Sequence, residues 1–455
     1  MLLSADAAVA RGRSYDEAHG DDGAPRAHYE PVLDAIERAG PRRLAESMRR
    51  AAATAGLSLG SGAQARPLPV DPVPRLFTAG EWATLEAGLV QRARLLSAVL
   101  AEAYAAGGRR GGSSCADVLT SSVYFEADLI GCQPAEALGI VGFDVVRAPS
   151  GGFAVLEDNV LTPGHAAASA LRGLHPLDPP VAVRDVHGPT LAALSAMLGE
   201  GDDVAILSDE PLARSSWELR WLGAALGVPV VGYDDLRVRR DRLVTRSGAP
   251  VRRLWQRTSE DRLRDDDGRL TRLGDLLHRP LRAGTVTSVN AIGCGVCDDK
   301  RTLRHTPGLM REWLGEEPLL PVAATLDLAV PEERAAALAA ASGMVFKPRN
   351  GAGGRGVSMP PHDSRALERA LATGAGWVAQ ELIPVSRHPT VAGDALAPRI
   401  VDARLFAVRT PAGWTVVPGG ASRYAASEAT GIVNTSQGGG VKDVWVLAGP
   451  GRPWR

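Results

Sequence analysis

The segment VFKPRNGAGGRG, residues 345–356, places a lysine between an apolar run and a glycine-rich loop. Arginine supplies 48 of the 51 basic side chains in the chain, and the lysines are Lys300, Lys347 and Lys442. A guanidinium is a broad planar fork, whereas an ammonium is a compact point charge that suits converging phosphate oxygens. Lys347 is therefore a candidate contact for phosphate.

The glycine loop does not match two well-known phosphate-binding loops. A Walker A loop carries its lysine after the glycines, at the start of a helix, and a dinucleotide-binding loop opens directly into a helix. Here the lysine comes first, and MVF and VSM on either side predict strands. We expect a hairpin flap whose backbone amides close over phosphates, with a plain turn as the alternative. The glycines of this flap are Gly351, Gly353, Gly354 and Gly356.

Composition bounds the class of protein. A chain of 455 residues is expected to form two or three domains, and 45% hydrophobic and 23% charged residues are typical of a globular protein. A formal net charge of -1 gives no general attraction to nucleic acid or to anionic membranes. Asp6 interrupts the apolar N-terminus, and no uncharged apolar stretch reaches the ~20 residues of a membrane helix. We expect a cytosolic (cytoplasmic) protein without a nucleic-acid or membrane partner.

The four cysteines agree with that expectation. Cys115, Cys132, Cys294 and Cys297 show no spacing typical of a disulfide framework. A single Cys-x-x-Cys pair is weak evidence for zinc, because a structural zinc site takes four ligands. We therefore interpret these residues as small buried thiols, with a redox or metal role as the less favoured alternative.

The pattern of apolar residues predicts a mixed α/β fold with four regions. Residues 1–140 are expected to be mainly helical, and 141–200 to hold a β-hairpin. Residues 201–285 alternate strand, helix and strand, which is typical of a small parallel α/β unit. Residues 286–455 are expected to be rich in strands.

Several elements are specified more closely. Apolar side chains recur on one face of a helix predicted at 80–106, namely at Trp82, Leu85, Leu89, Leu96 and Leu100. Helices are also expected at 331–343 and 363–374 from their end signals. DPVPRLF, residues 71–77, is extended by its prolines and is expected to cross a surface or line a cleft. SVNAIGCGVCDDK, residues 288–300, is expected to be a loop that leads into a helix near 307–315.

The segment VGFDVVRAPSGGFAVLEDN, residues 141–159, predicts a β-hairpin. A four-residue turn at 149–152 would place Asp144 directly opposite Glu157. Asn159 shares the face of Glu157, because alternate residues of a strand point the same way. Mg²⁺ takes oxygen ligands and reaches nucleotide phosphates through one or two carboxylates. The hairpin is therefore a candidate magnesium site, and a solvated face with paired charges is the alternative.

Two later strands add candidate residues. WVAQELI can form an apolar slot for adenine, with Gln380, Glu381 and Leu382 where the strand leaves the sheet; an ordinary core strand is the alternative. In RIVDARLFAVRT, Asp402 and Arg404 point one way and could add an acid near the metal and a cation for a transferring phosphoryl group. A second candidate cation, expected to act with Arg404 and Lys347 in catalysis, is Arg423.

Seven ordered motifs carry a resemblance to a known family. VLEDN, NAIGCGVCDDK, VFKPRNGAGGRGV, WVAQE, PRIVDARLFAV, VPGGASR and NTSQGGGVKD resemble the motif series of the circularly permuted type 2 ATP-grasp proteins, and more distantly the synthetase part of glutathionylspermidine synthases. The similarity runs from YDEAHG near residue 15 to KDVW at 445. An ordinary ATP-grasp chain has its acid-x-Asn metal motif after the glycine loop, whereas Glu157 and Asn159 precede it here.

The resemblance implies a permuted ATP-grasp fold with ATP and Mg²⁺ as cofactors. It makes 141–200 the permuted metal-binding segment, 201–285 a unit like the one that precedes an ATP-grasp, and 286–455 the nucleotide-binding subdomains. It implies that Lys300 and Lys347 contact phosphate or adenine. It also implies that Gln380 and the backbone after it lie at the adenine edge, and that Asp144, Glu157 and Asn159 hold Mg²⁺. Lys442 falls in a motif to which we assign no role.

The function that the resemblance implies is an ATP-dependent carboxylate-amine ligase that acts through an acyl phosphate on small-molecule or peptide substrates. One departure motivates an alternative. After LEDN the family usually continues with an arginine and a Pro-Ser-Gly turn, whereas this chain reads VLTPGH, with Leu161, Gly164 and His165. The alternative is a phosphotransferase, or a nucleotide-binding subunit of a larger assembly with a protein partner.

Overall fold

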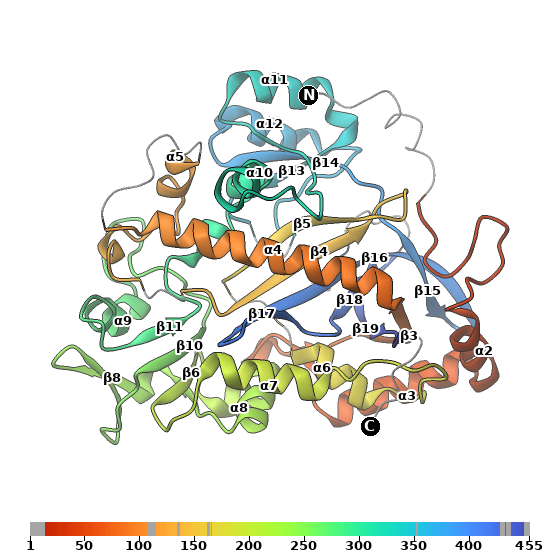
Figure 1. Ribbon diagram of the computed structural model, residues 1–455, viewed down its shortest axis with the longest axis horizontal. Helices are drawn as coiled ribbons and strands as arrows, with labels where there is room; N and C mark the ends of the chain where they lie inside the picture. The colour runs from red at the N-terminus through yellow and green to blue at the C-terminus, as the bar shows by residue number, and fades with distance from the viewer. Residues whose placement is uncertain are drawn as a thin grey trace.

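The computed structural model describes residues 14–106, 115–133, 137–161, 164, 166–351, 354–427, 433 and 438–449. Within these residues the fold is mixed α/β, with one large sheet at the centre and two smaller units beside it (Figure 1). None of the described helices is long and apolar enough to cross a membrane.

The large sheet joins segments from both ends of the chain. Among the described residues it has eight strands, with the order β3-β19-β18-β16-β4-β5 and with β15 and β17 paired to β16. The strands are β3 (Val70–Phe77), β4 (Ile140–Arg147), β5 (Phe153–Asn159), β15 (Arg387–Ala392), β16 (Ala395–Thr410), β17 (Gly413–Val416), β18 (Ala421–Tyr424) and β19 (Gly440–Val446). β3 and β19 run parallel, and the other pairs are antiparallel.

Helices cover both faces of this sheet, as expected from its longest strand, β16, which has apolar side chains on both faces. Leu405 and Ala407 of β16 pack into the core under α4 (Ala79–Ala103), whereas Phe406 and Val408 pack into a second core. The helices on the second face are α3 (Pro41–Thr54), α6 (Ala166–Leu174) and α7 (His187–Leu198). Figure 1 shows α4 crossing in front of β4 and β5.

The helix predicted at 80–106 is confirmed as α4. A capping box fixes its start, because Thr78 Oγ1 accepts from Glu81 N at 3.3 Å and Glu81 Oε2 accepts from Thr78 N at 2.8 Å. All five apolar residues that predicted the helix are buried.

The small parallel unit lies below the large sheet in Figure 1. Its strands have the order β11-β10-β6-β7 and are all parallel. The elements are β6 (Val204–Ser208), α8 (Trp217–Leu226), β7 (Val230–Gly232), β10 (Arg253–Arg257), α9 (Arg272–Arg282) and β11 (Thr287–Val289). A two-stranded hairpin, β8 (Leu236–Arg239) and β9 (Arg242–Thr245), packs against α9. The predicted alternation of strand, helix and strand is confirmed.

A third unit stands at the top of Figure 1 and carries the glycine loop. Its antiparallel sheet has the order β12-β14-β13. The elements are α10 (Lys300–Leu309), β12 (Thr325–Asp327), α11 (Pro331–Ala339), β13 (Met344–Pro348), α12 (Ser364–Thr373) and β14 (Trp377–Glu381). The helices expected at 331–343 and 363–374 are therefore confirmed, and the Asp363 carboxylate caps α12 by accepting from Arg365 N at 2.8 Å.

One expectation about local structure was wrong, and another was right only in part. DPVPRLF is extended, but it is a buried strand, β3: Phe77 packs into the core with α4, whereas Val73 and Leu76 pack against the N-terminal helices. The segment 288–300 is not one loop: β11 ends at Val289, a short 3₁₀ helix spans Cys294–Cys297, and α10 already begins at Lys300. The Asp299 side chain caps that helix, which therefore starts at Lys300 and not near 307. The helical sequence expected near 307–315 is present, because α10 runs to Leu309 and a π-helical turn spans Met310–Leu314.

The four predicted regions stay a prediction as domain boundaries. The large sheet takes β3 from the first region, β4 and β5 from the second, and its other strands from the last. The first region also contains the two short strands β1 (Ser58–Leu59) and β2 (Arg66–Pro67) beside its helices, which include α2 (Glu30–Ala39) and α5 (Ala116–Thr120).

Candidate functional site

The β4–β5 hairpin brings Asp144 and Glu157 face to face, as predicted. The turn differs from the expectation, because residues 148–152 form a five-residue connection and the pairing begins with Arg147 opposite Phe153. A bulge between Asp144 and Val145 then shifts the register by one residue. The longer turn and the bulge compensate, so that the predicted pair Asp144 and Glu157 is restored.

Two arginines from neighbouring strands surround Asp144. Arg404 of β16 lies opposite Asp144 in the ladder and binds it with both arms, Nε to Oδ1 at 2.7 Å and Nη2 to Oδ2 at 2.8 Å. Arg423 of β18 donates to Oδ2 of Asp144 at 2.7 Å and also pairs with Asp402. Burial alone would raise the pKa of Asp144, but the two guanidinium groups outweigh it and hold the pKa below its usual value.

Asn159 and Asp402 complete this cluster. Asn159 donates from Nδ2 to Asp144 Oδ1 at 3.4 Å, and its Oδ1 accepts from Arg404 Nη2 at 3.3 Å. Burial raises the pKa of Asp402, and the facing Asp144 carboxylate adds to the shift while Arg423 opposes it. Five predicted residues, three acceptors and two cations, therefore share one face of the sheet: Asp144, Asn159, Asp402, Arg404 and Arg423.

Glu157 joins this cluster to the unit that carries the glycine loop. Lys347 Nζ lies 3.3 Å from Glu157 Oε1, and Lys300 Nζ lies 3.8 Å from the same oxygen. The Glu157 side chain is 27% exposed, whereas those of Lys347 and Lys300 are 10% and 8% exposed. Burial would raise the pKa of Glu157, but the two ammonium groups outweigh it and lower the pKa. The structure therefore brings together the early acidic hairpin and the late basic segment.

Gln380 bridges the same two parts of the molecule. It accepts from Lys347 Nζ at 2.6 Å through Oε1 and donates to the Leu156 carbonyl at 3.2 Å through Nε2. At the end of β14 the amide of Glu381 donates to Ala324 O at 2.7 Å, and the amide of Leu382 donates to Gly343 O at 2.9 Å. The assignment of these three residues to an adenine edge stays a prediction.

The start of the glycine loop is firmly held. Arg349 Nε lies 2.8 Å and 2.7 Å from the two oxygens of Asp299, and both side chains are buried. Lys300 Nζ donates to the carbonyl of Gly351 at 2.7 Å. Gly354 and Gly356 have φ angles of 69° and 74°, which side chains with a Cβ rarely adopt. Gly353 lies outside the described residues.

The strands expected around the loop are only partly present. MVF is part of β13, but VSM forms a single bridge, between Ser358 and Phe346, and no strand is assigned to these three described residues. The tight turns at Gly354 and Gly356 leave little extended chain after the loop.

Asp298 was missed as a site residue. Its Oδ2 accepts from the amide of Val160 at 2.9 Å, directly after Asn159, and burial raises the pKa of its carboxyl to about 6 although Lys300 opposes that shift. The CDDK motif contained the signal, because Asp298 and Asp299 directly precede Lys300, but only the lysine was interpreted as a site residue. Asp299, the second of them, holds Arg349.

Lys442 and the cysteines do not belong to this cluster. Lys442 of β19 is fully buried and pairs with Asp71, its partner in the neighbouring strand β3. Cys115, Cys294 and Cys297 are buried and form no disulfide, and burial raises the pKa of Cys294 and Cys297 well above the usual value. Reactive thiolates need a lowered pKa. The interpretation as buried thiols therefore fits, while Cys132 is partly exposed.

The donor set fits a hard cation. No group of three or more His, Cys, Asp or Glu able to hold a metal occurs among the described residues. Two ionised carboxylates and an amide oxygen, from Asp144, Glu157 and Asn159, are nevertheless the kind of incomplete oxygen set that Mg²⁺ supplements with water and phosphate. The Glu157 carboxylate is the most accessible of the three acids in the cluster.

The departure after LEDN falls mostly outside the described residues, which include Leu161 and Gly164 but not His165. Gly164 lies against Glu218 at the start of α8, because a Cβ built on Gly164 would be 3.5 Å from Glu218 Oε2. A small cavity beside α8 is lined by Ser216, Leu219, Arg257, Thr258 and Ser259. The chain after the hairpin thus leads toward the small parallel unit.

Comparison with known proteins agrees with the motif series. Residues 74–425 match the family described as circularly permuted ATP-grasp type 2. An uncharacterised protein of Mycobacterium leprae is 32% identical over 469 residues, which cover 96% of this chain and 82% of the relative. A protein of Frankia alni, provisionally named glutamate–cysteine ligase 2-3, is 36% identical over 471 residues, which cover 95% of this chain and 54% of the relative. The chain thus spans about half the length of this relative.

A solved structure supports the fold. A glutathione synthetase-like effector from Globodera pallida, in its apo form, superposes with a TM-score of 0.57 at 12% identity and covers 90% of this chain and 98% of its own. The expected mixed α/β fold is confirmed. Since the family match covers well over half of the chain, this protein belongs to the circularly permuted type 2 ATP-grasp family, a family of ATP-binding proteins.

Proposed function

We propose that this protein is an ATP-dependent and Mg²⁺-dependent ligase that joins a carboxylate to an amine. The observation that carries the proposal is the approach of Lys347 Nζ to Glu157 Oε1, at 3.3 Å, from segments 190 residues apart. A phosphate-binding cation and a metal-binding carboxylate have to meet at one triphosphate. Family membership supports ATP as the nucleotide, and the ligase name of the Frankia relatives supports the class of reaction.

The cluster provides holding and positioning groups. Asp144, Glu157 and Asn159 would hold Mg²⁺, which neutralises charge on the phosphates when bound. Lys347 and Lys300 would contact phosphate oxygens, since both ammonium groups point at the accessible Glu157 carboxylate. Loss of the Glu157 charge would remove the carboxylate that both ammonium groups face and leave Lys347 bonded to Gln380 and Lys300 to the Gly351 carbonyl.

The two arginines of the cluster are assigned a role in phosphoryl transfer. Arg404 stabilises the ionised form of Asp144 and fixes the orientation of its carboxylate through two bonds. Arg404 and Arg423 are 22% and 17% exposed, so both can also face an incoming anion. Their proposed role is to neutralise charge on the phosphoryl group as it is transferred.

The proposed reaction needs no protein nucleophile. A carboxylate oxygen of the acid substrate attacks the γ-phosphorus of ATP, ADP leaves, and an acyl phosphate forms. The amine nitrogen then attacks the acyl carbon and loses a proton, and phosphate leaves with one oxygen of the original carboxylate. Catalysis is then mainly the alignment of three reactants and the neutralisation of their charge.

The test follows an oxygen atom. The protein is incubated with ATP, Mg²⁺ and a panel of acids labelled with ¹⁸O in the carboxylate, together with amines; glutamate and cysteine are the first pair because of the Frankia names. We expect ADP, an amide product and inorganic phosphate that carries one ¹⁸O, all lost when EDTA removes the metal. ADP formation without label in the phosphate would contradict the acyl phosphate.

The alternative is separated by the same assay. A phosphorylated product without release of phosphate would favour a phosphotransferase. ATP binding without turnover, together with a stable protein partner, would favour a nucleotide-binding subunit. This alternative rests on the altered sequence after LEDN, in which Gly164 lies close to Glu218.

A further inference from the structure

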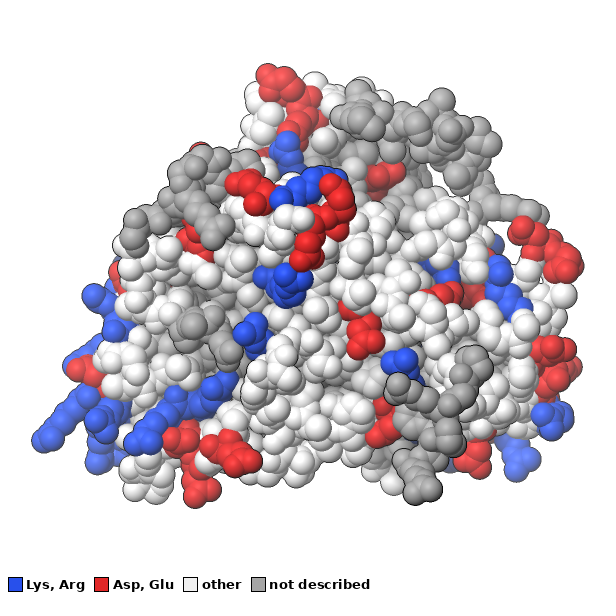
Figure 2. Space-filling model, viewed as in Figure 1, with Lys and Arg blue, Asp and Glu red and all other residues white. Residues whose placement is uncertain are grey.

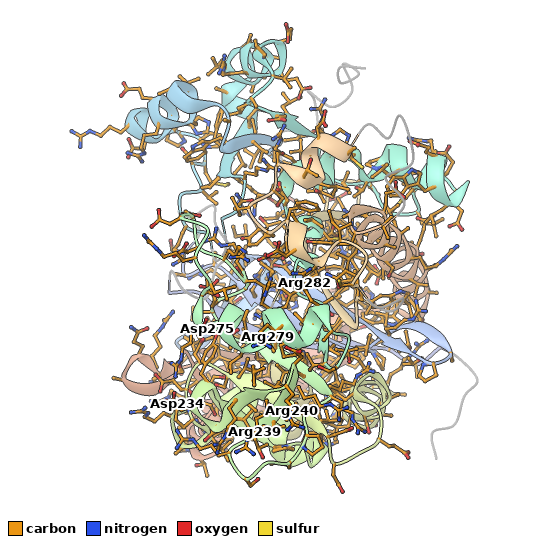
Figure 3. All side chains as sticks on the ribbon, turned by 90° about the vertical axis from the view of Figure 1, so that its left-hand side faces the viewer. Asp234, Arg239, Arg240, Asp275, Arg279 and Arg282 are labelled. Atoms are coloured by element: carbon orange, nitrogen blue, oxygen red, sulfur yellow. The ribbon has the colours of Figure 1, made fainter. Side chains whose placement is uncertain are left out.

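An arginine-rich surface lies on the small parallel unit, away from the cluster described above. Arg239 ends β8, Arg240 is in the turn, and Arg242 begins β9, while Arg279 and Arg282 come from the last turn of α9. All five side chains are exposed. We call these five residues the arginine patch. Figure 2 shows basic side chains projecting over this region at the lower left, and Figure 3 shows four of the five on one side of the molecule.

The patch carries more positive charge than its surroundings neutralise. Arg279 pairs with Asp241 in the turn at 2.7 Å, and both side chains are well exposed. Among the described residues, the side chains of the other four arginines have no ion-pair partner. The whole chain has a formal net charge of -1, so this excess is local. Such a surface attracts an anionic partner and steers its approach.

The β8–β9 hairpin, which carries Arg239, Arg240 and Arg242, contains unfavourable interactions. Arg239 and Arg242 are direct partners across the β8–β9 ladder, and like charges in that position destabilise a hairpin. Arg240 and Asp241 have φ angles of 49° and 61°, where glycine or asparagine is usual in a two-residue turn. Carboxylates from a partner would relieve the repulsion between Arg239 and Arg242.

The pattern of charge favours carboxylates over the phosphates of nucleic acid. Aspartates lie within and around the patch and would repel a continuous phosphate backbone: Asp234 and Asp275 are exposed, and Asp241 is partly exposed. Tyr233, before the hairpin, is buried with Arg272 over its ring, so it does not offer a stacking surface for bases. Guanidinium forks bind carboxylates through two parallel bonds. In the two Frankia relatives the matched region covers 54% and 53% of the relative's own length. In those proteins this fold is therefore joined to further polypeptide.

We propose that the arginine patch is a docking surface for an acidic segment of a partner protein. The contact would pair glutamate or aspartate side chains with Arg239 and Arg242 across the hairpin, and with Arg279 and Arg282 beside it. This proposal is independent of the ligase reaction, because none of these arginines belongs to the nucleotide site.

The experiment measures binding of a fluorescein-labelled oligoglutamate peptide to the full chain by fluorescence anisotropy. We expect the double variant Arg239→Glu/Arg242→Glu to weaken binding about tenfold or more, and added salt to weaken wild-type binding, since the contact is a surface one. The matched control is Arg252→Glu/Arg269→Glu, which makes the same change of charge at exposed arginines outside the patch, 66% and 76% exposed. It should retain the affinity of the wild type within about twofold.

Three results would overturn the proposal: no binding of the peptide by the wild type, equal weakening by both double variants, or tighter binding of a single-stranded RNA with the same number of charges. A stability measurement separates binding from folding. Arg239→Glu alone replaces a repulsive cross-strand pair with an attractive one, so its melting temperature should equal or exceed that of the wild type while peptide binding falls. A lower melting temperature would contradict the argument from repulsion.

Discussion

The two faces of the large sheet carry the same kinds of charged residue but hold them differently. Asp144 and Arg147 of β4 lie on opposite faces, since they are three residues apart in one strand. On the face of Arg147, Glu17 lies between Arg75 and Arg147, and the exposed fractions of the three side chains are 1%, 1% and 4%. On the face of Asp144, the Glu157 side chain is 27% exposed.

The difference lies in how completely each carboxylate is satisfied. Glu17 Oε1 accepts from Arg75 at 2.6 Å and from Ser386 at 2.5 Å, and its Oε2 accepts from Arg147 at 3.0 Å. From the described residues, Glu157 accepts one long bond, from Lys347 at 3.3 Å. We call Glu17 with its three partners the closed network. The open cluster is the group on the other face: Asp144, Glu157, Asn159, Lys300, Lys347 and Arg404. The closed network fastens the N-terminal segment to the sheet, whereas in the open cluster the partly exposed Glu157 carboxylate keeps acceptor positions for ligands.

The largest expected effect is on the closed network. Glu17→Gln leaves Arg75 and Arg147 buried with too little negative charge, so we expect a loss of about 3–5 kcal/mol in the free energy of unfolding. Denaturant or thermal unfolding measures it. The control is Glu46→Gln in an exposed pair with Arg42, 42% and 66% exposed, which should cost about 0.5 kcal/mol or less. Equal effects of the two variants would remove the distinction between the network and an ordinary surface pair.

The next effect concerns Asp298 and pH. Its pKa is raised from 3.8 to about 6 by burial, with Lys300 opposing the shift. As pH rises from about 4 to about 6, Asp298 loses its proton in the unfolded chain before it does so in the folded protein. This difference lowers the free energy of unfolding, by about 3 kcal/mol once Asp298 is ionised in both states. Asp298→Asn cannot ionise. The difference in stability between variant and wild type should therefore grow in favour of the variant over that range, as unfolding at several pH values would show; a constant difference would refute the shift.

The open cluster should respond in activity and not in stability. Glu157→Gln removes the accessible carboxylate that faces Lys347 and Lys300. We expect ADP production to fall about 100-fold, equivalent to about 2.7 kcal/mol, with ATP binding partly retained and the unfolding free energy little changed. Parallel assays of ADP release, ATP affinity and unfolding test this. A large loss of stability with unchanged ADP release would reverse the roles of the two regions.

The smallest expected effect tests geometry within the open cluster. Arg404→Lys keeps the charge but loses the fork that binds both oxygens of Asp144. We expect about a tenfold drop in turnover, or about 1.4 kcal/mol, without loss of folding. Activity equal to that of the wild type would mean that Arg404 acts as a point charge and not through its two bonds.

The sequence predicted the open cluster well because its motifs are short and periodic. The alternation of VGFDVVR and FAVLEDN placed Asp144, Glu157 and Asn159 on one face, and the rarity of lysine identified Lys347. The bulge beside Asp144 was not predictable, since nothing in the residues marks the extra position, and the correct pairing was reached with a turn one residue too short. Asp298 was missed because its role depends on burial, which adjacent residues do not reveal.

The closed network could not be predicted from the sequence. Glu17 meets Arg75, Arg147 and Ser386 only after the chain has folded, at separations of 58, 130 and 369 residues. DPVPRLF was expected to cross a surface or line a cleft because its prolines keep it extended, and nothing in these residues shows the N-terminal helices that bury it. Among the described residues β3 is the end strand of the sheet, beside β19, a position that tolerates prolines.

The most direct test of the central claim is ATP affinity after removal of the cation that joins the two parts of the open cluster. Lys347→Met retains much of the length of the side chain and removes its charge; Arg269→Met, at an exposed arginine paired with Asp267, is the control. Isothermal titration with ATP and Mg²⁺ should show a loss of affinity of about 100-fold or more for Lys347→Met and none for the control, with both proteins folded. Equal affinity of Lys347→Met and wild type would contradict the account.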